Sequence, residues 1–324
     1  MAVRKKTESK TNAHWEREAL EKIALSALGE QKIARRWGIF FKSITFLYLF
    51  VLLFFAFGAS HTKGGSGNHT ALIEINGVIG EKEEVNAKDF FESVQRAYES
   101  RGTKGIILKI NSPGGSPVQA GMINDEIKRQ KKLHPHIPVY AVVEDICASG
   151  GYYIAVAADE IFVDKASIVG SIGVLMDGFG FTETMKKAGV ERRLMTAGSN
   201  KAMLDPFSPV NPKQQAFVQD MLNQVHQQFI QVVKDGRGNR LKESPETFSG
   251  LFWNGEDAVK LGLADGFGNY DYVAREIIKA EEVVDFTTYE GFADRFARKF
   301  GASLGSSMNE SLRTAILNQK LIIK

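Results

Sequence analysis

The sequence predicts an α/β fold preceded by one membrane-spanning helix. From residue 71 onward, short apolar runs of strand length alternate with segments whose apolar residues recur at helical spacing. Such alternation is typical of helices that cover a largely parallel sheet. Before this part of the chain lies an almost continuously apolar run, residues 39–59, which is long enough to cross a bilayer.

The composition is that of a folded protein and excludes several classes of site. The 324 residues are 44% hydrophobic and 24% charged, and they suffice for one large core or two smaller ones. A net charge of +3, without a basic stripe carrying interleaved aromatic residues, gives no indication of nucleic-acid binding. The single cysteine, Cys147, excludes an internal disulfide and a cysteine-based zinc site, and the six histidines show no metal-ligand spacing. We therefore expect neither a metal nor a nucleic-acid partner.

The N-terminal region is predicted to anchor the chain in a membrane. Residues 1–38 are polar and basic, and helical spacing over 16–28 predicts a short amphipathic helix that ends at Gly29. The apolar run 39–59 has one charge, Lys42, near its N-terminal end, where the side chain can snorkel. The long segment before the run favours an uncleaved signal anchor over a cleaved signal peptide. Lys and Arg residues crowd that side, so the positive-inside rule predicts a cytoplasmic N-terminus and a periplasmic or extracytoplasmic remainder.

A flexible Gly- and Ser-containing linker is predicted over residues 60–70, followed by a folded domain over 71–285 and a mostly helical tail over 286–324. Asn86 and Ser116 are the expected N-caps of the first two helices of the domain. Strands are predicted at 71–79, 104–110, 139–143, 160–163 and 191–195. Helices are predicted at 87–100, at 117–133, directly after Ser149, and at 212–234.

Ser149 lies where a predicted buried strand turns into a helix, and two glycines follow it. The unpaired N–H groups of a helix N-terminus favour nearby negative charge, and glycines allow close approach of a substrate backbone. These features are those of a nucleophile. The alternative is that Ser149 only caps the helix, as serines before helices commonly do.

Three further segments bear on Ser149. The two glycines in 111–116 follow a strand and form either a nest of N–H groups for an oxyanion or an ordinary turn. Ser171 lies among apolar residues and glycines, so we expect it to be buried and its hydroxyl to need a partner. Lys201 lies in a polar loop, where lysines are usually solvated.

A serine nucleophile needs a base, which is usually histidine, but no histidine of the folded part has an obvious route to Ser149. A lysine can serve instead if burial lowers its pKa towards neutrality. A buried hydroxyl such as that of Ser171 would hold such a lysine. The spacing of these segments along the sequence does not by itself show that they form one site.

A resemblance to a known family joins them. In order and spacing, four motifs resemble the signal peptide peptidase A family, whose members are membrane-anchored serine–lysine proteases of the crotonase-like/Clp protease fold. The resemblance covers roughly residues 70–285. The motifs are Asn111–Gly115, Ala148–Tyr153, Gly170–Gly173 and Gly198–Lys201.

The resemblance implies a role for each motif. Ser149 would be the nucleophile and Lys201 the general base of a Ser-Lys dyad, with Ser171 orienting the lysine ammonium. Gly114 and Gly150 would donate their backbone N–H groups to the oxyanion. The serine would attack the scissile carbonyl and form an acyl-enzyme that water hydrolyses, without a cofactor.

The resemblance also implies a substrate class and an assembly. Members of the family degrade remnant signal peptides in the membrane, accepting small or apolar residues, and form homo-oligomers in which neighbouring subunits complete each site. This sequence departs from the family in one respect. Ala202 follows Lys201 where the family often has an acidic residue, and Asp205 comes later.

Three alternatives remain open at this point. A crotonase-like acyl-CoA enzyme would share the fold but would be a soluble chain with a catalytic carboxylate. A membrane scaffold would keep the fold without the chemistry. A cysteine hydrolase would use Cys147, which requires a partly exposed and electropositive thiol.

Overall fold

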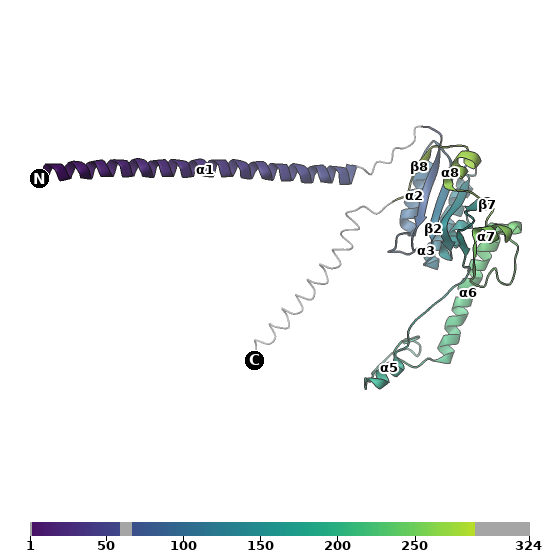
Figure 1. Ribbon diagram of the computed structural model, residues 1–324. Helices are drawn as coiled ribbons and strands as arrows, with labels where there is room; N and C mark the ends of the chain where they lie inside the picture. Colours follow the sequence, from purple (N-terminus) through teal and green to yellow (C-terminus); the bar gives the residue numbers. More distant parts are fainter. Residues whose placement is uncertain (1, 59–66, 289–324) are drawn as a thin grey trace. The chain divides into compact units, whose positions relative to one another are not determined.

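The computed structural model describes residues 2–58 and 67–288, which belong to two compact units. The first unit contains the described residues 2–58, and the second contains the described residues 67–288 (Figure 1). The predicted tail falls outside the described residues from 289 onward, and its first residues, 286–288, are not helical. Residues 60–66 of the predicted linker and residue 59 of the predicted anchor also lie outside them.

The described residues of the first unit form a single helix, α1 (Ala2–Gly58). The predicted end of a short helix at Gly29 is wrong, because the helix continues through it. One glycine costs a helix only about 1 kcal/mol relative to alanine, which a long apolar helix tolerates. Within the described residues, one stretch is long and apolar enough to cross a membrane by length and composition, Leu28–Leu53, with a mean hydropathy of 1.5. None of this stretch is buried, and it is compatible with the predicted anchor.

The second unit is built on an eight-stranded sheet in the order β6-β5-β3-β2-β1-β8, with β4 paired to β3 and to β7. All strand pairs are parallel except β5 with β6. The predicted α/β fold with a largely parallel sheet is thereby confirmed. The strands are β1 (His69–Asn76), β2 (Thr103–Ser112), β3 (Val139–Ala148), β4 (Glu160–Val163), β5 (Ile168–Gly170), β6 (Phe252–Asn254), β7 (Gly266–Phe267) and β8 (Val283–Asp285).

Helices cover both faces of the sheet, as a parallel sheet requires. Asn86 and Ser116 cap α2 and α3 as predicted, each accepting the N–H of the residue three positions later. The helices are α2 (Ala87–Glu99), α3 (Pro117–Leu133), α4 (Gly150–Ala155), α5 (Thr182–Lys187), α6 (Pro212–Arg237), α7 (Gly255–Lys260) and α8 (Tyr270–Tyr272), with the short helices η1 (Gly238–Arg240) and η2 (Val273–Ile278).

Several boundaries differ from the predictions by a few residues, and one predicted strand is absent. The first strand begins at His69 rather than Ala71, because His69 and Thr70 are buried and the Thr70 hydroxyl donates to the Ala280 carbonyl at 2.7 Å. The strand predicted at 191–195 does not form. Those residues are exposed and pair with no other strand among the described residues.

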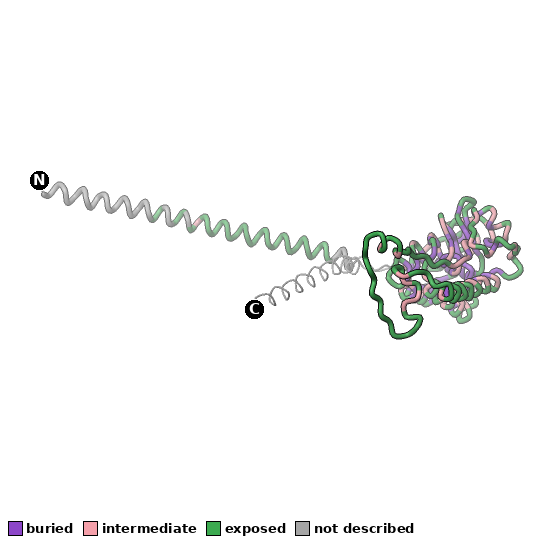
Figure 2. Tube along the Cα trace, turned by 90° about the horizontal axis from the view of Figure 1, so that it is seen from below, coloured by how far each residue is buried: buried purple, intermediate pink, exposed green. Residues whose placement is uncertain are grey.

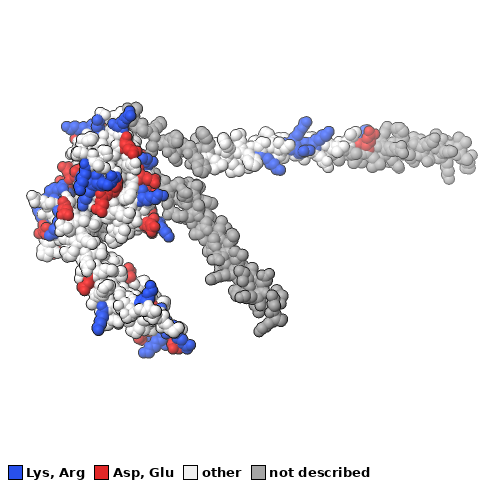
Figure 3. Space-filling view, turned by 180° about the vertical axis from the view of Figure 1, so that it is seen from behind, with Lys and Arg blue, Asp and Glu red and all other residues white. Residues whose placement is uncertain are grey.

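Residues 174–211 form a segment, here called the arm, that contains α5 and leaves the sheet before returning into α6 (Figure 1). Buried residues are concentrated around the sheet, whereas no residue of the arm is buried (Figure 2). Lys and Arg are interspersed with Asp and Glu over the second unit on the face shown in Figure 3. The arm is therefore an exposed extension of an otherwise packed α/β unit.

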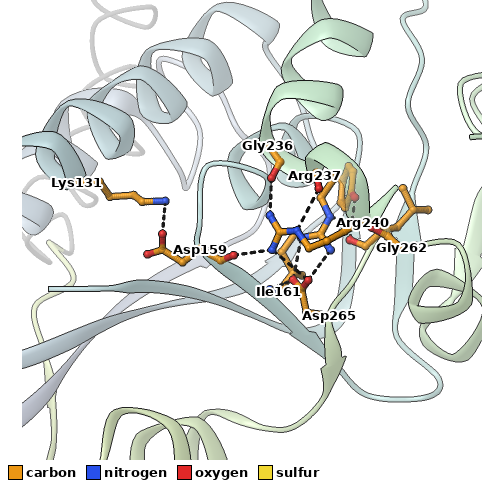
Figure 4. Close-up of polar contacts among 10 residues, drawn as sticks. Lys131, Asp159, Ile161, Gly236, Arg237, Arg240, Gly262 and Asp265 are labelled. Atoms are coloured by element: carbon orange, nitrogen blue, oxygen red, sulfur yellow. Dashed lines mark hydrogen bonds and ion pairs between the residues drawn. The ribbon is translucent and has the colours of Figure 1, made fainter. Parts of the chain in front are cut away.

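A buried ion pair fixes the C-terminal end of α6 to the sheet (Figure 4). The Arg237 side chain is 1% exposed and donates two hydrogen bonds to the Asp265 carboxylate, at 2.8 and 2.9 Å, and one to the Gly262 carbonyl. Asp265 also accepts the Ile161 N–H and a bond from Arg240. The Asp265 carboxylate thus accepts hydrogen bonds from two arginines and one backbone N–H. Removing Asp265 would leave the buried Arg237 guanidinium without a charged partner.

We expect Asp265→Ala to lower the free energy of unfolding by about 3 kcal/mol, because it strands the buried Arg237 guanidinium. The control is Glu276→Ala, which removes an exposed ion pair with Arg275 and should change stability by less than about 0.5 kcal/mol. Urea denaturation of the two variants and the wild type measures the difference. An unchanged midpoint for Asp265→Ala would contradict the assignment.

The same pair predicts an acid limb of stability. Burial alone would raise the pKa of Asp265, but the hydrogen bonds and charge of Arg237 outweigh it and lower the pKa below the ordinary 3.8. A carboxyl whose folded pKa is depressed stabilises the fold above its unfolded pKa and loses this contribution as the pH falls through the folded value. The stability difference between wild type and Asp265→Ala should therefore shrink below about pH 4.

Candidate active site

The ends of adjacent parallel strands bring Ser149 and Ser171 together. Ala148, the last residue of β3, is paired with Gly170, the last residue of β5, so the two serines follow at the same edge of the sheet. The Ser149 N–H donates to the Gly170 carbonyl at 2.8 Å. The segments that carry Ser149 and Ser171 are therefore adjacent within a single chain.

Ser149 lies on a sharp turn between β3 and α4. Its backbone has φ +53° and ψ −121°, a conformation that a side chain with a Cβ rarely adopts. Its side chain makes no capping hydrogen bond to α4, so the alternative of a plain helix cap is not realised. Strain of this kind persists only where the surroundings enforce it, and it commonly marks functional positions. Ser149 is half-buried, and its hydroxyl has no hydrogen-bond partner within residues 2–58 and 67–288, which suits a nucleophile.

Gly114 is packed directly against Ser149 and Gly150. A Cβ on Gly114 would lie 2.7 Å from both the Gly150 nitrogen and the Ser149 Cβ, and the residue has φ +103°. Only glycine fits this position. The loop after β2 and the turn after β3 thus form one contiguous site.

We expect Gly114→Ala to reduce activity at least about 100-fold, because the new Cβ must displace the backbone donors beside Ser149. The matched control is Gly121→Ala on α3, where a Cβ meets nothing within 4 Å. That variant should keep full activity and be slightly more stable, since alanine is the better helix former. Comparing peptide hydrolysis by the two variants measures the effect, and equal rates would contradict it.

The backbone N–H groups around Ser149 only partly follow the sequence-based assignment. The Gly150 N–H has no hydrogen-bond partner among the described residues, as an oxyanion donor requires. The Gly114 N–H donates to the Ser112 hydroxyl at 3.2 Å, whereas the Gly115 N–H is unpaired in the described part of the chain. Gly115 is thus a candidate donor that the sequence reasoning missed, although its motif contained both glycines.

Ser171 is half-buried rather than buried as expected. Its backbone has φ +51°, close to that of Ser149, and its N–H donates to the Leu251 carbonyl at 2.8 Å. Its hydroxyl has no hydrogen-bond partner among the described residues. Both serines of the proposed site therefore have unpaired hydroxyls on strained turns.

Lys201 does not join this site within one chain. It lies in an exposed turn of the arm, where its N–H donates to the Gly198 carbonyl at 3.1 Å. No contact between its ammonium and either Ser149 or Ser171 is present among the described residues. Among the described residues Asp205 forms an ion pair with Arg192, at 2.6 Å, and none with Lys201. The expected dyad is not assembled by a single copy of the chain.

The arm exposes a series of large apolar side chains, and contiguous exposed apolar surface commonly marks an interaction site. A cavity of about 450 Å³ lies within it, lined in part by Met185, Val190, Leu194 and Phe207. Exposed apolar residues of the arm are Leu175, Met176, Phe179, Phe181, Val190, Leu194, Met195, Leu204, Phe207 and Val210. The arm therefore has the composition of an interaction surface.

Cys147 is fully buried in the core two residues before Ser149. Burial raises the pKa of its thiol, which disfavours the thiolate. The alternative of a cysteine nucleophile is therefore not supported.

Comparison with known proteins identifies a peptidase domain. Residues 131–284 match peptidase family S49. The chain is 29% identical over 236 residues to the signal peptide peptidase SppA of Enterococcus faecium, covering 70% of this chain and 68% of that protein. It is 30% identical over 222 residues to protease 4 of Haemophilus influenzae, covering 67% of this chain and 35% of that protein.

A third relative differs in name. Over 176 residues, 54% of this chain, the sequence is 46% identical to the Na(+)/H(+) antiporter NhaA of Brucella melitensis. The chain spans only 24% of that protein's length. The matched portion is therefore a minor part of the antiporter.

Two solved structures resemble the fold. A variant of the 1510-N membrane-bound stomatin-specific protease has a TM-score of 0.37 at 16% identity, covering 69% of this chain and 96% of that one. A ClpP1 variant of Listeria monocytogenes has a TM-score of 0.39 at 15% identity, covering 61% of this chain and 91% of that one.

Proposed function

Since the chain belongs to the signal peptide peptidase A family within peptidase family S49, we propose that it is a membrane-anchored serine endopeptidase with a Ser-Lys dyad. The observation that carries this proposal is the strained turn at Ser149, where the hydroxyl and the neighbouring Gly150 N–H have no hydrogen-bond partner among the described residues. Peptidase relatives make a peptide carbonyl the natural electrophile. The turn then supplies the nucleophile and one oxyanion donor in a single structural unit.

In the proposed reaction, the neutral amine of Lys201 removes the proton of the Ser149 hydroxyl as its oxygen attacks the scissile carbonyl. The N–H of Gly150, with that of Gly114 or Gly115, stabilises the oxyanion. The lysine then returns the proton to the leaving amine, which departs as the acyl-enzyme forms. Water, deprotonated by the same lysine, releases the acyl group. Ser171 orients the ammonium between these steps.

We propose further that Lys201 acts on the Ser149 of a neighbouring copy. The support is that one chain leaves Lys201 exposed on the arm, while the apolar surface of the arm is uncovered. Docking the arm on a second copy would bury this surface. It would also surround the lysine with protein, and removal from water favours the neutral amine that a base requires.

The proposed substrates are remnant signal peptides or other apolar peptides close to the membrane. An anchor at 39–59 would hold the peptidase domain next to the bilayer in which such peptides remain, with the N-terminus cytoplasmic and the domain periplasmic or extracytoplasmic. The anchor and its orientation are part of the proposal.

The experiment that tests the proposal is hydrolysis of a short peptide of small apolar residues by the full chain in detergent micelles. Wild-type hydrolysis that is lost in Ser149→Ala supports a serine peptidase. No hydrolysis by a correctly assembled wild-type protein would instead favour a membrane scaffold that keeps the fold without the chemistry.

A further inference from the structure

Helix α6 contacts the candidate active site at two points on one of its faces. Phe229 is buried, and its ring centroid lies 5.1 Å from that of Tyr153 in α4, the helix that follows Ser149. One turn earlier, the Nε2 atom of His226 lies 3.1 Å from the carbonyl oxygen of Ile172, the residue after Ser171. Residues three apart share a helix face. A single face of α6 therefore contacts both α4, the helix that follows Ser149, and Ile172, the residue after Ser171.

The contact fixes the protonation of one ring nitrogen. A carbonyl oxygen can only accept a hydrogen bond, so Nε2 of His226 must carry the proton and donate. In the neutral ring, Nδ1 is then the nitrogen without a proton. The imidazole acts here as a donor to backbone, and it makes no contact with the Ser149 hydroxyl among the described residues.

The loop that His226 contacts is also held by its own backbone and by one buried side chain. The Ser171 N–H donates to the Leu251 carbonyl, the Gly173 N–H donates back to Ser171, and the Gly170 carbonyl accepts the Ser149 N–H. The Ile172 side chain is fully buried. In the described part of the chain, His226 supplies the one side-chain hydrogen bond to residues 170–173. Because Ser171 has φ +51°, its conformation depends on such external contacts.

The contact also closes the base of the arm. The chain leaves the sheet after Gly173, runs through the arm and returns into α6 at Pro212. The hydrogen bond between His226 and Ile172 joins the outgoing and returning ends, which are 54 residues apart. This hydrogen bond is therefore placed to limit how far a displacement of the arm, as on contact with another molecule, moves the Ser171 turn.

We propose that His226 is a positioning residue that holds the Ile172 carbonyl and thereby fixes the Ser171 turn beside Ser149. The inference rests on the proposed peptidase function, because the turn matters for catalysis only if Ser149 is the nucleophile. It assigns a role to His226, a histidine of α6. The sequence alone showed no connection between any histidine of the folded part and Ser149.

The test uses the full chain in detergent micelles and three variants. His226→Leu removes the donor, and His226→Gln retains an N–H of similar reach. The control, Gln228→Leu, makes the same kind of change at an exposed position on another side of α6. Two quantities are measured, kcat and KM for a short apolar peptide and the hydrogen–deuterium exchange of residues 168–175.

We expect His226→Leu to lower kcat about tenfold or more with little change in KM, since small misplacements of catalytic groups have effects of this size. Exchange in 168–175 should be faster in this variant, while His226→Gln and Gln228→Leu stay close to wild type. Wild-type exchange and kcat in His226→Leu would overturn the proposal. So would equal losses in both His226 variants with a lowered Tm, which would make His226 a packing residue.

The exchange measurement keeps this inference separate from the proposed function. If Ser149→Ala retained full activity, the assignment of the nucleophile would fail. The exchange of 168–175 in His226→Leu would still decide whether His226 holds the loop.

Discussion

Replacing Ser149 by alanine is expected to lower kcat/KM for an apolar peptide by about 10⁴-fold or more, because loss of the nucleophile leaves only substrate positioning and oxyanion stabilisation. The fold should tolerate the change. The Ser149 side chain caps no helix, and alanine has the same Cβ, so the backbone strain at φ +53° is unchanged. We expect the stability to change by less than about 0.5 kcal/mol.

A control separates this effect from a general sensitivity to serine replacement. Ser100 lies just before β2, at the opposite, amino-terminal end of the sheet strands, and Ser100→Ala should hydrolyse peptide at nearly the wild-type rate. Peptide hydrolysis measures both the loss of activity in Ser149→Ala and its retention in Ser100→Ala. Mass spectrometry detects an acyl adduct on Ser149 wherever that serine is present. A Ser149→Ala protein with wild-type kcat/KM would remove Ser149 as nucleophile.

The parts of the site that depend on strand ends could be predicted from the sequence. The carboxyl ends of parallel strands meet at one edge, so the loops after the predicted strands 104–110 and 139–143 had to lie together, whereas β5, which precedes Ser171, was not predicted. Ser149 and Gly114 accordingly form one unit, in which a Cβ on Gly114 would lie 2.7 Å from the Ser149 Cβ. The caps at Asn86 and Ser116 were predictable for a related reason, because capping depends on residues only three apart.

The remaining parts depend on contacts that leave no periodic signal. His226 bonds a backbone carbonyl 54 residues earlier, and neither its spacing nor its polar surroundings indicate that partner. The apolar residues of 191–195 suggested a strand, but a strand requires a neighbour, and the arm offers none among the described residues. Gly29 suggested a helix end, but one glycine cannot stop a long helix by itself.

The exposed position of Lys201 leads to the second large effect. Lys201→Ala should abolish hydrolysis as fully as Ser149→Ala, because without a base the serine hydroxyl remains a weak nucleophile. The two inactive variants should nevertheless restore activity to each other when they are co-expressed. If the dyad forms between copies, a Lys201→Ala chain still offers Ser149, and a Ser149→Ala chain still offers Lys201.

The fraction of activity that returns on co-expression distinguishes a dyad formed between copies from a dyad formed within one chain. In randomly mixed assemblies with head-to-tail contacts, about a quarter of the sites pair an intact Ser149 with an intact Lys201, so about a quarter of the wild-type rate should return. Mixing the purified variants without subunit exchange is the control, and it should give no activity. A dyad within one chain predicts no recovery in either case, because no chain then carries both groups. Inactive co-assemblies would therefore require the arm to fold back onto its own Ser149, bringing Lys201 out of the exposed turn that it occupies here.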